Sequence, residues 1–421
     1  MAKKHVTFIH SGDLHLGAPF RGLRSLSDAW ADRLTEAIPE AFDRLIEAAL
    51  TRQVDFVVLA GDVFDASRPS YRDVIRFVDG MKRLGEAGIP VYYCTGNHDP
   101  YTSWKSDYAA PPENVHMFSA EGPSFFAHTK DGRALVLLGG RGYYNHVVPA
   151  DVDIAKGITR AAAVKALGTS APFSVGVVHT GLNLDPTKAP TDPARLLSSG
   201  IDYWACGHIH QPWLNDPRDP RIGFSGCIQG RDIKETGARG CFAVTLRENA
   251  CAQVEFVPLA SVAWQKLQID VSSCTTLAQA HDAITRALFA ANGTAQCEEM
   301  VARVFLTGKT PLHRVLVQPG VLEDLRREVN DGYPVFFVDS IVDRTSADIS
   351  RSALKEEGLF EATLLRRSKA LGKDRDATVA HLQDEFLQHS LQLPSTCVNR
   401  LDRLEKEAEQ LALDLLDGSR S

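Results

Sequence analysis

The sequence predicts a layered α/β sandwich, followed by a small separate α/β module and a helical tail. Across the first 260 residues, short apolar runs rich in β-branched and aromatic residues alternate with segments of helical periodicity. The alternation restarts near residue 264, and from about residue 345 only helical periodicity remains. A chain of 421 residues is too long for one simple core, and we expect the domains 1–260, 261–344 and 345–421.

The first domain is expected to begin with a βαβαβ unit. Its strands read HVTFIHS, VDFVVLA and IPVYYC, and its helices read EAFDRLIEAALTRQ and YRDVIRFVDGMKRLGEAG. Five further runs follow, ALVLLGG, FSVGVVHTGL, IDYWACGHIH, RIGFSGC and GCFAVTL, bounded by Gly, Pro or Asn. Short β-branched or aromatic runs between turn residues are typical of strands. A βαβαβ start with a strand-rich second half therefore predicts sheets packed in layers.

The second domain is expected to be a small α/β module. WQKLQID, MVARVFLTG and PVFFVDSIV read as strands, and LAQAHDAITRALFAA and VLEDLRREVN between them read as helices. The order strand, helix, strand, helix, strand fits a separate unit of about 80 residues.

The tail ends in a helix with an apolar stripe. The stripe residues Leu401, Leu404, Ala408, Leu411 and Leu415 recur at spacings of three and four, with charged residues between them. The stripe covers only about two and a half heptads, too short for a stable coiled coil by itself. Two interpretations stay open: the stripe docks on a partner, or it packs against its own protein.

Composition narrows the class of protein. The net charge of −7 is not typical of a nucleic-acid-binding domain, which is usually basic overall. The start MAKKHVTFIHSGD has too short an apolar run for a signal peptide, and no later segment is long and apolar enough to span a membrane. The eight cysteines are scattered without a C-x-x-C pair, which disfavours zinc fingers and disulfide frameworks. We therefore expect a cytoplasmic protein with reduced thiols.

Five predicted strands end in side chains that bind metals well and fill cores poorly. The motifs are GDLH, GDVFD, GNHD, VVHTG and CGHIH, and they carry Asp13, His15, Asp62, Asp65, Asn97, His98, Asp99, His179, His208 and His210. Taken singly, each histidine is more typical of a surface or a core than of a ligand set. In an open α/β sheet, however, the loops at the carboxyl ends of strands meet. Five such ends in one chain therefore predict one shared site.

The residue types in this set point to a pair of divalent metals and phosphate ester hydrolysis. All are nitrogen or oxygen donors, which favours Mn, Fe or Zn over a closed structural zinc site. A D-x-H pair would place both side chains on one side of an extended strand end. Asn97 is expected as a neutral oxygen ligand, His98 as a group reaching the substrate, and Asp99 as a group that orients a neighbour.

The five motifs, in this order, resemble the metallophosphoesterase (calcineurin-like) superfamily over about residues 5–260. The phrases FIHSGDLHLGAPFRGL, GNHDPYTSW, PENVHMFSAEG and SGCIQGRDIKETGARGC look like the bacterial YhaO family, relatives of the SbcD nuclease subunit of the SbcC–SbcD DNA-repair complex. The resemblance implies a four-layer β-sandwich flanked by helices, with a small capping domain and a helical C-terminal tail.

The resemblance also implies roles for individual residues. The first ion would be held by Asp13, His15, Asp62 and His210, and the second by Asp62, Asn97, His179 and His208, while His98 matches the family's catalytic histidine. Manganese is the implied working metal, with iron, zinc or magnesium as alternatives. The implied activity is hydrolysis of DNA as an exonuclease, with single-strand endonuclease activity in addition. The implied partners are DNA, an SbcC-like coiled-coil ATPase docked on the tail, and a second copy of the chain.

Two other functions use the same fold. One is a phosphodiesterase or phosphatase for small nucleotides or phosphoproteins, and the other is a scaffold without catalysis. The complete ligand set argues against the scaffold. The capping domain and the tail favour the nuclease, because a compact nucleotide phosphodiesterase rarely needs them.

Overall fold

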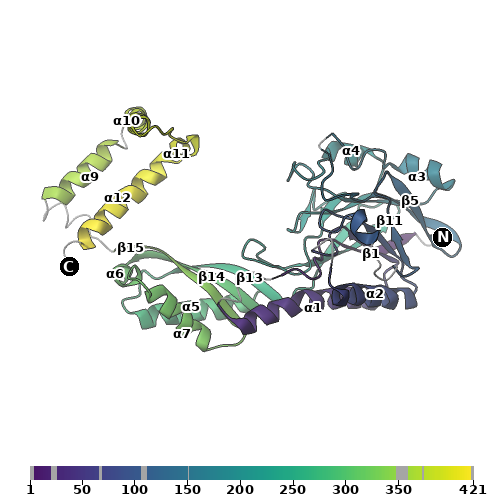
Figure 1. The fold of residues 1–421 in the computed structure, drawn as a ribbon, viewed down its shortest axis with the longest axis horizontal. Coiled ribbons are helices and arrows are strands. Elements are labelled where there is room, and N and C mark those ends of the chain that lie inside the picture. The colour runs from purple at the N-terminus through teal and green to yellow at the C-terminus, as the bar shows by residue number, and fades with distance from the viewer. Residues whose placement is uncertain are drawn as a thin grey trace. The chain divides into compact units, whose positions relative to one another are not determined.

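The computed structural model describes residues 4–19, 26–65, 69–105, 111–149, 151–347, 359–371 and 374–418. Contacts between Cα atoms divide the chain into two units. Figure 1 shows the helices and strands of the described residues. The first unit comprises Met1–Lys266, Ala290–Ala302 and Pro334–Asp339, and the second comprises Leu267–Phe289, Arg303–Tyr333 and Ser340–Ser421. The predicted three-part division at residues 260 and 344 stays a prediction.

The first unit contains two six-stranded sheets. The first sheet has the order β12-β11-β1-β2-β3-β4, with β1 (His5–Ser11), β2 (Phe56–Ala60), β3 (Val91–Cys94), β4 (Val115–Met117), β11 (Gly240–Arg247) and β12 (Gln253–Pro258). Strands β1 to β4 are parallel, whereas β11 pairs antiparallel with both β1 and β12. The βαβαβ start predicted from the sequence therefore forms the centre of this sheet.

The second sheet follows the order β5-β6-β7-β8-β10-β9. Its strands are β5 (Ser124–Lys130), β6 (Arg133–Arg141), β7 (Phe173–His179), β8 (Tyr203–Gly207), β9 (Trp213–Leu214) and β10 (Ile222–Phe224). Strands β6, β7, β8 and β10 run parallel, and the edge strands β5 and β9 are antiparallel to their neighbours. All residues of β7 and β8 are buried, as expected for a parallel strand covered on both faces.

The two sheets pack face to face through an aromatic and aliphatic core. Phe8 of β1 stacks on Phe56 of β2 with ring centroids 4.7 Å apart, and its edge meets Tyr203 of β8 at 5.9 Å. Val58 and Val177, also in this core, are fully buried. Burying these side chains supplies most of the driving force for joining the sheets, at roughly 25 cal/mol per Å² of apolar surface.

Helices cover the outer faces of both sheets. Helices α1 (Asp28–Arg52) and α2 (Tyr71–Glu86) share a core cluster with strands β1 to β3. On the second sheet, α3 (Arg160–Leu167) packs against β5 and β6, and Leu196 of α4 (Pro193–Ser198) packs beside Trp204. The layers are helix, sheet, sheet and helix, which confirms the predicted four-layer α/β sandwich.

A three-stranded sheet with the order β13-β14-β15 follows the sandwich in sequence. Its strands are β13 (Val262–Asp270), β14 (Glu299–Thr310) and β15 (Phe336–Ala347), and its helices are α5 (Leu277–Asn292), α6 (His313–Leu316) and α7 (Val321–Asp331). Each of the five elements expected in this part of the chain lies in one of these strands or in α5 or α7.

The described part of the tail is helical, as expected. It contains α9 (Leu359–Leu371), α10 (Arg375–Gln388), α11 (Ser395–Asn399) and α12 (Leu401–Gly418), and α12 packs against α9 and α11. Of the predicted stripe, Leu401 is buried, whereas Leu404 is 38% and Leu411 60% exposed; the side chain of Leu415 lies outside the described part of the chain. Among the helices that the structure describes, none is long and apolar enough to cross a membrane.

Candidate metal centre

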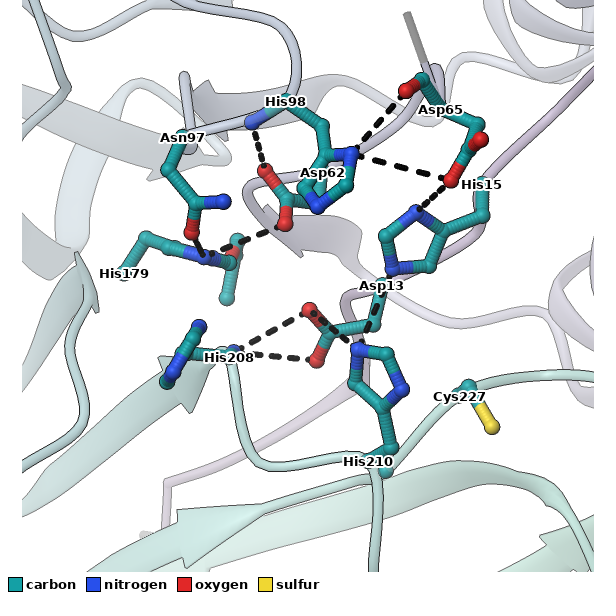
Figure 2. A network of polar contacts seen from close by, with 12 residues as sticks. Asp13, His15, Asp62, Asp65, Asn97, His98, His179, His208, His210 and Cys227 are labelled. Atoms are coloured by element: carbon teal, nitrogen blue, oxygen red, sulfur yellow. Dashed lines mark hydrogen bonds and ion pairs between the residues drawn. The ribbon is translucent and has the colours of Figure 1, made fainter. Parts of the chain in front are cut away.

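The predicted ligands meet at one edge of the sandwich, where β1, β2, β3, β7 and β8 end. Figure 2 shows Asp13, His15, Asp62, Asn97, His98, His179, His208 and His210 around a common space, together with Asp65 and Cys227. The carbonyl oxygen of Ala60, at the end of β2, lies 2.9 Å from Nδ1 of His179, at the end of β7. The carboxyl ends of the two sheets are therefore adjacent, as the rule for open α/β sheets predicts.

Turns beyond the strand ends present four of the predicted ligands, whereas His179 is the last residue of β7. Asp13, His15 and Asp62 have φ values of 51°, 50° and 52°, and His208 has a φ of 103°. These left-handed conformations cost about 1–3 kcal/mol each in residues other than glycine, and they cluster at functional sites. The expectation that D-x-H shares one side of an extended strand was wrong, because β1 already ends at Ser11.

Two glycines leave room for the turns. Gly61 has a φ of 88°, and a Cβ atom there would lie 2.5 Å from Nδ1 of His179. A Cβ atom on Gly96 would lie 2.1 Å from Oδ1 of Asp62. Both contacts are shorter than carbon atoms allow, so the glycines of GDVFD and GNHD let two loops approach the ligands closely.

The first group of ligands consists of Asp13, His15 and His210. Nδ1 of His15 lies 3.0 Å from Oδ1 of Asp65, and Nδ1 of His210 lies 2.5 Å from Oε1 of Glu235. The contact of His210 is a hydrogen bond and that of His15 an ion-pair distance. A carboxylate beside Nδ1 favours the proton on that nitrogen, which in the neutral ring leaves the lone pair on Nε2. The Nε2 atoms of His15 and His210 lie 3.1 Å apart, and Oδ1 of Asp13 lies 3.8 Å from Nε2 of His210. Such an arrangement fits a cation between them.

The second group consists of Asp62, Asn97 and His179. Nδ1 of His179 donates to the carbonyl oxygen of Ala60, so in the neutral ring Nε2 presents a lone pair. That Nε2 lies 3.0 Å from Oδ1 of Asn97 and 3.3 Å from Oδ2 of Asp62. Burial alone would lower the pKa of His179, but the Asp62 carboxylate outweighs burial and raises that pKa to about 9. These three groups attract positive charge, which again suits a cation.

Asp62 lies close to members of both groups. Its carboxylate lies within 4.8 Å of ligand atoms of His15 and His98 in one cluster, and of Asp13 and His179 in another. Burial alone would raise the pKa of Asp62, but the surrounding imidazoles lower it, so the buried carboxyl group stays ionised. A carboxylate shared between two donor sets is the group that a pair of metal ions requires.

His208 is arranged differently from the other imidazoles. Its Nε2 lies 3.1 Å from Oδ2 of Asp185, and its backbone N–H donates to both carboxylate oxygens of Asp13, at 3.1 and 3.0 Å. Nδ1 is therefore the His208 nitrogen left to act as a ligand. The sequence did not single out Asp185, because its loop, GLNLDPTKAP, matches none of the metal motifs.

His98 and Asp99 point in opposite directions. Nδ1 of His98 lies 2.9 Å from the carbonyl oxygen of Asp65, and 41% of its side chain is exposed. The Asp99 carboxylate is buried and accepts from the backbone N–H groups of Asp62, Val63 and Gly96 and from the Tyr93 hydroxyl. Asp99 thus holds the loop that carries Asp62 and has no contact with open space.

Three more residues beside the first group had no role in the sequence-based prediction. They are Cys227, Arg231 and Glu235, all within the phrase SGCIQGRDIKETGARGC. Cys227 forms a possible cluster with His210 and Glu235, but burial raises the pKa of its thiol, and Nδ1 of His210 is already bound by Glu235. The donors that remain are carboxylates, imidazoles and an amide, which fit two divalent cations.

Comparison with known proteins agrees with this geometry. Residues 6–212 match the calcineurin-like phosphoesterase family, and residues 264–346 match the middle domain of the metallophosphoesterase YhaO. This chain belongs to the metallophosphoesterase superfamily. The two matches lie in the sandwich and in the segment that forms the three-stranded sheet.

Several curated metallophosphoesterases align with much of the chain. The uncharacterized metallophosphoesterase YhaO of Bacillus subtilis is 34% identical over 65% of this chain and 65% of its own length. The DNA double-strand break repair protein Mre11 of Aeropyrum pernix is 27% identical over 55% of this chain and 56% of its own, and that of Methanopyrus kandleri 25% identical over 84% and 76%. The chain thus spans less than two thirds of the first two relatives.

Replacing Asp62 should affect both groups at once. We expect Asp62→Asn to bind well below two metal ions per chain and to lose hydrolysis, because the amide removes the charge shared by the two donor sets. The fold should survive, since the amide keeps the size of the carboxyl group. Elemental analysis of the purified variant, beside its circular dichroism spectrum, checks this. Two tightly bound ions in the variant would refute the assignment.

Proposed function

We propose that this metallophosphoesterase hydrolyses phosphodiester bonds of DNA, acting as an exonuclease and on single strands also as an endonuclease. The observation that supports hydrolysis is the pair of neighbouring metal-ligand groups, with the Asp62 carboxylate close to both. DNA as the substrate draws support from the relatives named for DNA double-strand break repair. The predicted capping domain and the tail also suit a polymer better than a small nucleotide.

The proposed roles of the ligands follow the two groups. Asp13, His15, Asp62 and His210 would hold one ion, and Asp62, Asn97, His179 and His208 the other. When bound, such a pair of ions supplies Lewis-acid activation of water and neutralises charge on the phosphate. Oxygen and imidazole donors without a thiolate suit manganese, our choice of metal, as well as iron, zinc or magnesium.

His98 is the proposed acid–base group. Because its Nδ1–H is directed to the carbonyl oxygen of Asp65, its Nε2 is the atom that can hold a proton for the leaving oxygen. The half-exposed ring can reach a substrate, whereas the buried Asp99 acts only by holding the Asp62 loop. Of the two residues proposed as catalytic, His98 would act on the substrate and Asp99 would hold the loop that carries Asp62.

A second candidate function, hydrolysis of small nucleotides or phosphoproteins, is favoured by one observation. The net charge of −7 repels a long polyanion, so DNA binding would depend on local basic surface.

The eight cysteines, each in the described part of the chain, are free thiols. Free thiols are what a reducing compartment maintains, and we place the protein in the cytoplasm.

The choice between these substrates can be tested directly. We expect Mn²⁺-dependent digestion of end-labelled single- and double-stranded DNA, lost on chelation, at rates above those for nucleotide and phosphoprotein substrates assayed in parallel. Hydrolysis of the small substrates alone would support the second function and exclude DNA as the main substrate.

His98 can be separated from the ligands by substitution. We expect His98→Ala to keep both ions and to lose about 10²–10⁴-fold in turnover, the usual contribution of a general acid or base. Metal content and turnover are measured on one preparation. His5→Ala, an exposed histidine at the opposite end of β1, serves as the control and should change neither quantity. Wild-type turnover in the His98 variant would contradict the proposed role.

The tail is the proposed docking site for the helices of a coiled-coil ATPase. Residues of α9, α10, α11 and α12 line an apolar groove of about 580 Å³, and Leu404 of the stripe lies in it, 38% exposed. An amphipathic helix binds such a groove through its apolar face. A second copy of the chain is the alternative occupant.

Docking can be tested without touching the sandwich. We expect truncation before Ser350 to leave hydrolysis of a small model phosphodiester nearly unchanged and to abolish co-purification with the ATPase. Leu404→Glu should do the same, because it puts a charge into the groove. Leu387→Glu is the matched control, since Leu387 is 64% exposed in α10 and does not line the groove. A truncated chain that still binds the ATPase, or that loses its metals, would contradict the proposal.

A further inference from the structure

Five side chains form a closed ring beside the first group of ligands. Starting from His15, Nδ1 lies 3.0 Å from Oδ1 of Asp65, which accepts from Nη1 of Arg231 at 2.8 Å. Nη2 of Arg231 lies 3.5 Å from Oε1 of Glu235, and the same oxygen lies 2.5 Å from Nδ1 of His210. The ring closes where the Nε2 atoms of His210 and His15 lie 3.1 Å apart (Figure 2 shows this side of it).

The three charged members of this ring are largely removed from water. The exposed fractions of their side chains are 19% for Asp65, 23% for Arg231 and 13% for Glu235. Oε1 of Glu235 faces both Nδ1 of His210 and Nη2 of Arg231. The backbone N–H of Arg231 also donates to Oε2 of Glu235 at 2.7 Å, which fixes both carboxylate oxygens.

The ring acts on the metal ligands through their far nitrogens. A carboxylate bound to Nδ1 of a histidine keeps the proton on that nitrogen and sets the angle of the ring, so that Nε2 is available at a fixed place. Glu235 does this for His210 through a hydrogen bond, and Asp65 faces Nδ1 of His15 in an ion-pair contact at 3.0 Å. A planar guanidinium can join two carboxylates in defined directions, which an ammonium group cannot.

We propose that Arg231 is a positioning residue that joins Asp65 and Glu235 and thereby holds His15 and His210 ready to bind the first ion. The proposal rests on the proposed two-metal function. It makes the two donor sets unequal, because His179 of the second group is held by the backbone carbonyl of Ala60 and needs no ring. Replacing Arg231 should therefore lower the affinity for one of the two ions and leave the affinity for the other unchanged.

The test is a titration of the metal-free protein with Mn²⁺, following free Mn²⁺ by electron paramagnetic resonance. We expect Arg231→Gln and Glu235→Gln each to raise the dissociation constant of one of the two ions about 10–100-fold, the usual effect of losing a partner of a metal-bound histidine. The other ion should keep its affinity within about threefold. Arg231→Lys should restore only part of the loss, because it keeps the charge without the fork.

Two controls separate positioning from general stability. Asp232→Asn removes one negative charge from the same segment, as Glu235→Gln does, but the side chain of Asp232 is exposed. This variant should therefore keep both affinities for Mn²⁺. The double variant Arg231→Gln/Glu235→Gln should lose less than the product of the single losses, because Arg231 acts in part through Glu235. Thermal unfolding of each metal-free variant shows whether the fold has changed.

The outcomes distinguish this proposal from the function on which it rests. A wild-type protein that binds fewer than two ions would overturn the two-metal assignment itself. Two ions in the wild type with unchanged affinities in Arg231→Gln would overturn only the role of Arg231. Equal weakening of both ions, or losses that simply multiply in the double variant, would also overturn it.

Discussion

The centre of this metallophosphoesterase is built from carboxylates and imidazoles held close together in a largely buried place. The Nε2 atoms of His15, His179 and His210 meet the carboxylates of Asp13 and Asp62, and four of these five side chains are buried. Acceptor atoms that face one another in a buried place lose hydration and repel one another. The turns and the close glycines hold this set in place, and the ring through Arg231 is proposed to do the same for His15 and His210.

The sequence was sufficient for the parts of this design that are local. Apolar runs bounded by turn residues predicted the sheets, and the four-layer sandwich is confirmed. The same runs showed that Asp13, Asp62 and His179 lie at the carboxyl ends of strands. Parallel pairing brings Asp13 and Asp62 to one edge of the first sheet, and the contact of His179 with Ala60 joins that edge to the second sheet. Whether these residues bind metals and act on DNA stays a prediction, since the sequence and the geometry identify the side chains that could bind and do not identify the metal ion or the substrate.

The remaining features depend on contacts between distant residues. Asp65 and Arg231 are separated by 166 positions, and no local pattern in RDIKE indicates an ion pair with GDVFD. The left-handed turns were missed for another reason, since D-x-H also fits an extended strand. Helix α1 begins at Asp28, well before the predicted EAFDRLIEAALTRQ, because it continues through Pro39, a residue that normally ends or kinks a helix.

Strain at the centre and rigidity of the sandwich depend on each other. Four ligand-bearing residues adopt left-handed conformations, at about 1–3 kcal/mol each, against a typical net stability of about 5–15 kcal/mol for a domain. Only a surrounding structure with a large free energy of unfolding can hold these conformations, and the fully buried strands β2, β7 and β8 contribute to that stability. An ion at about 1,000 times its dissociation constant adds roughly 4 kcal/mol through binding to the folded state alone. If the site binds metals as proposed, metal binding and folding of the sandwich are coupled, because each stabilises the conformation that the other requires.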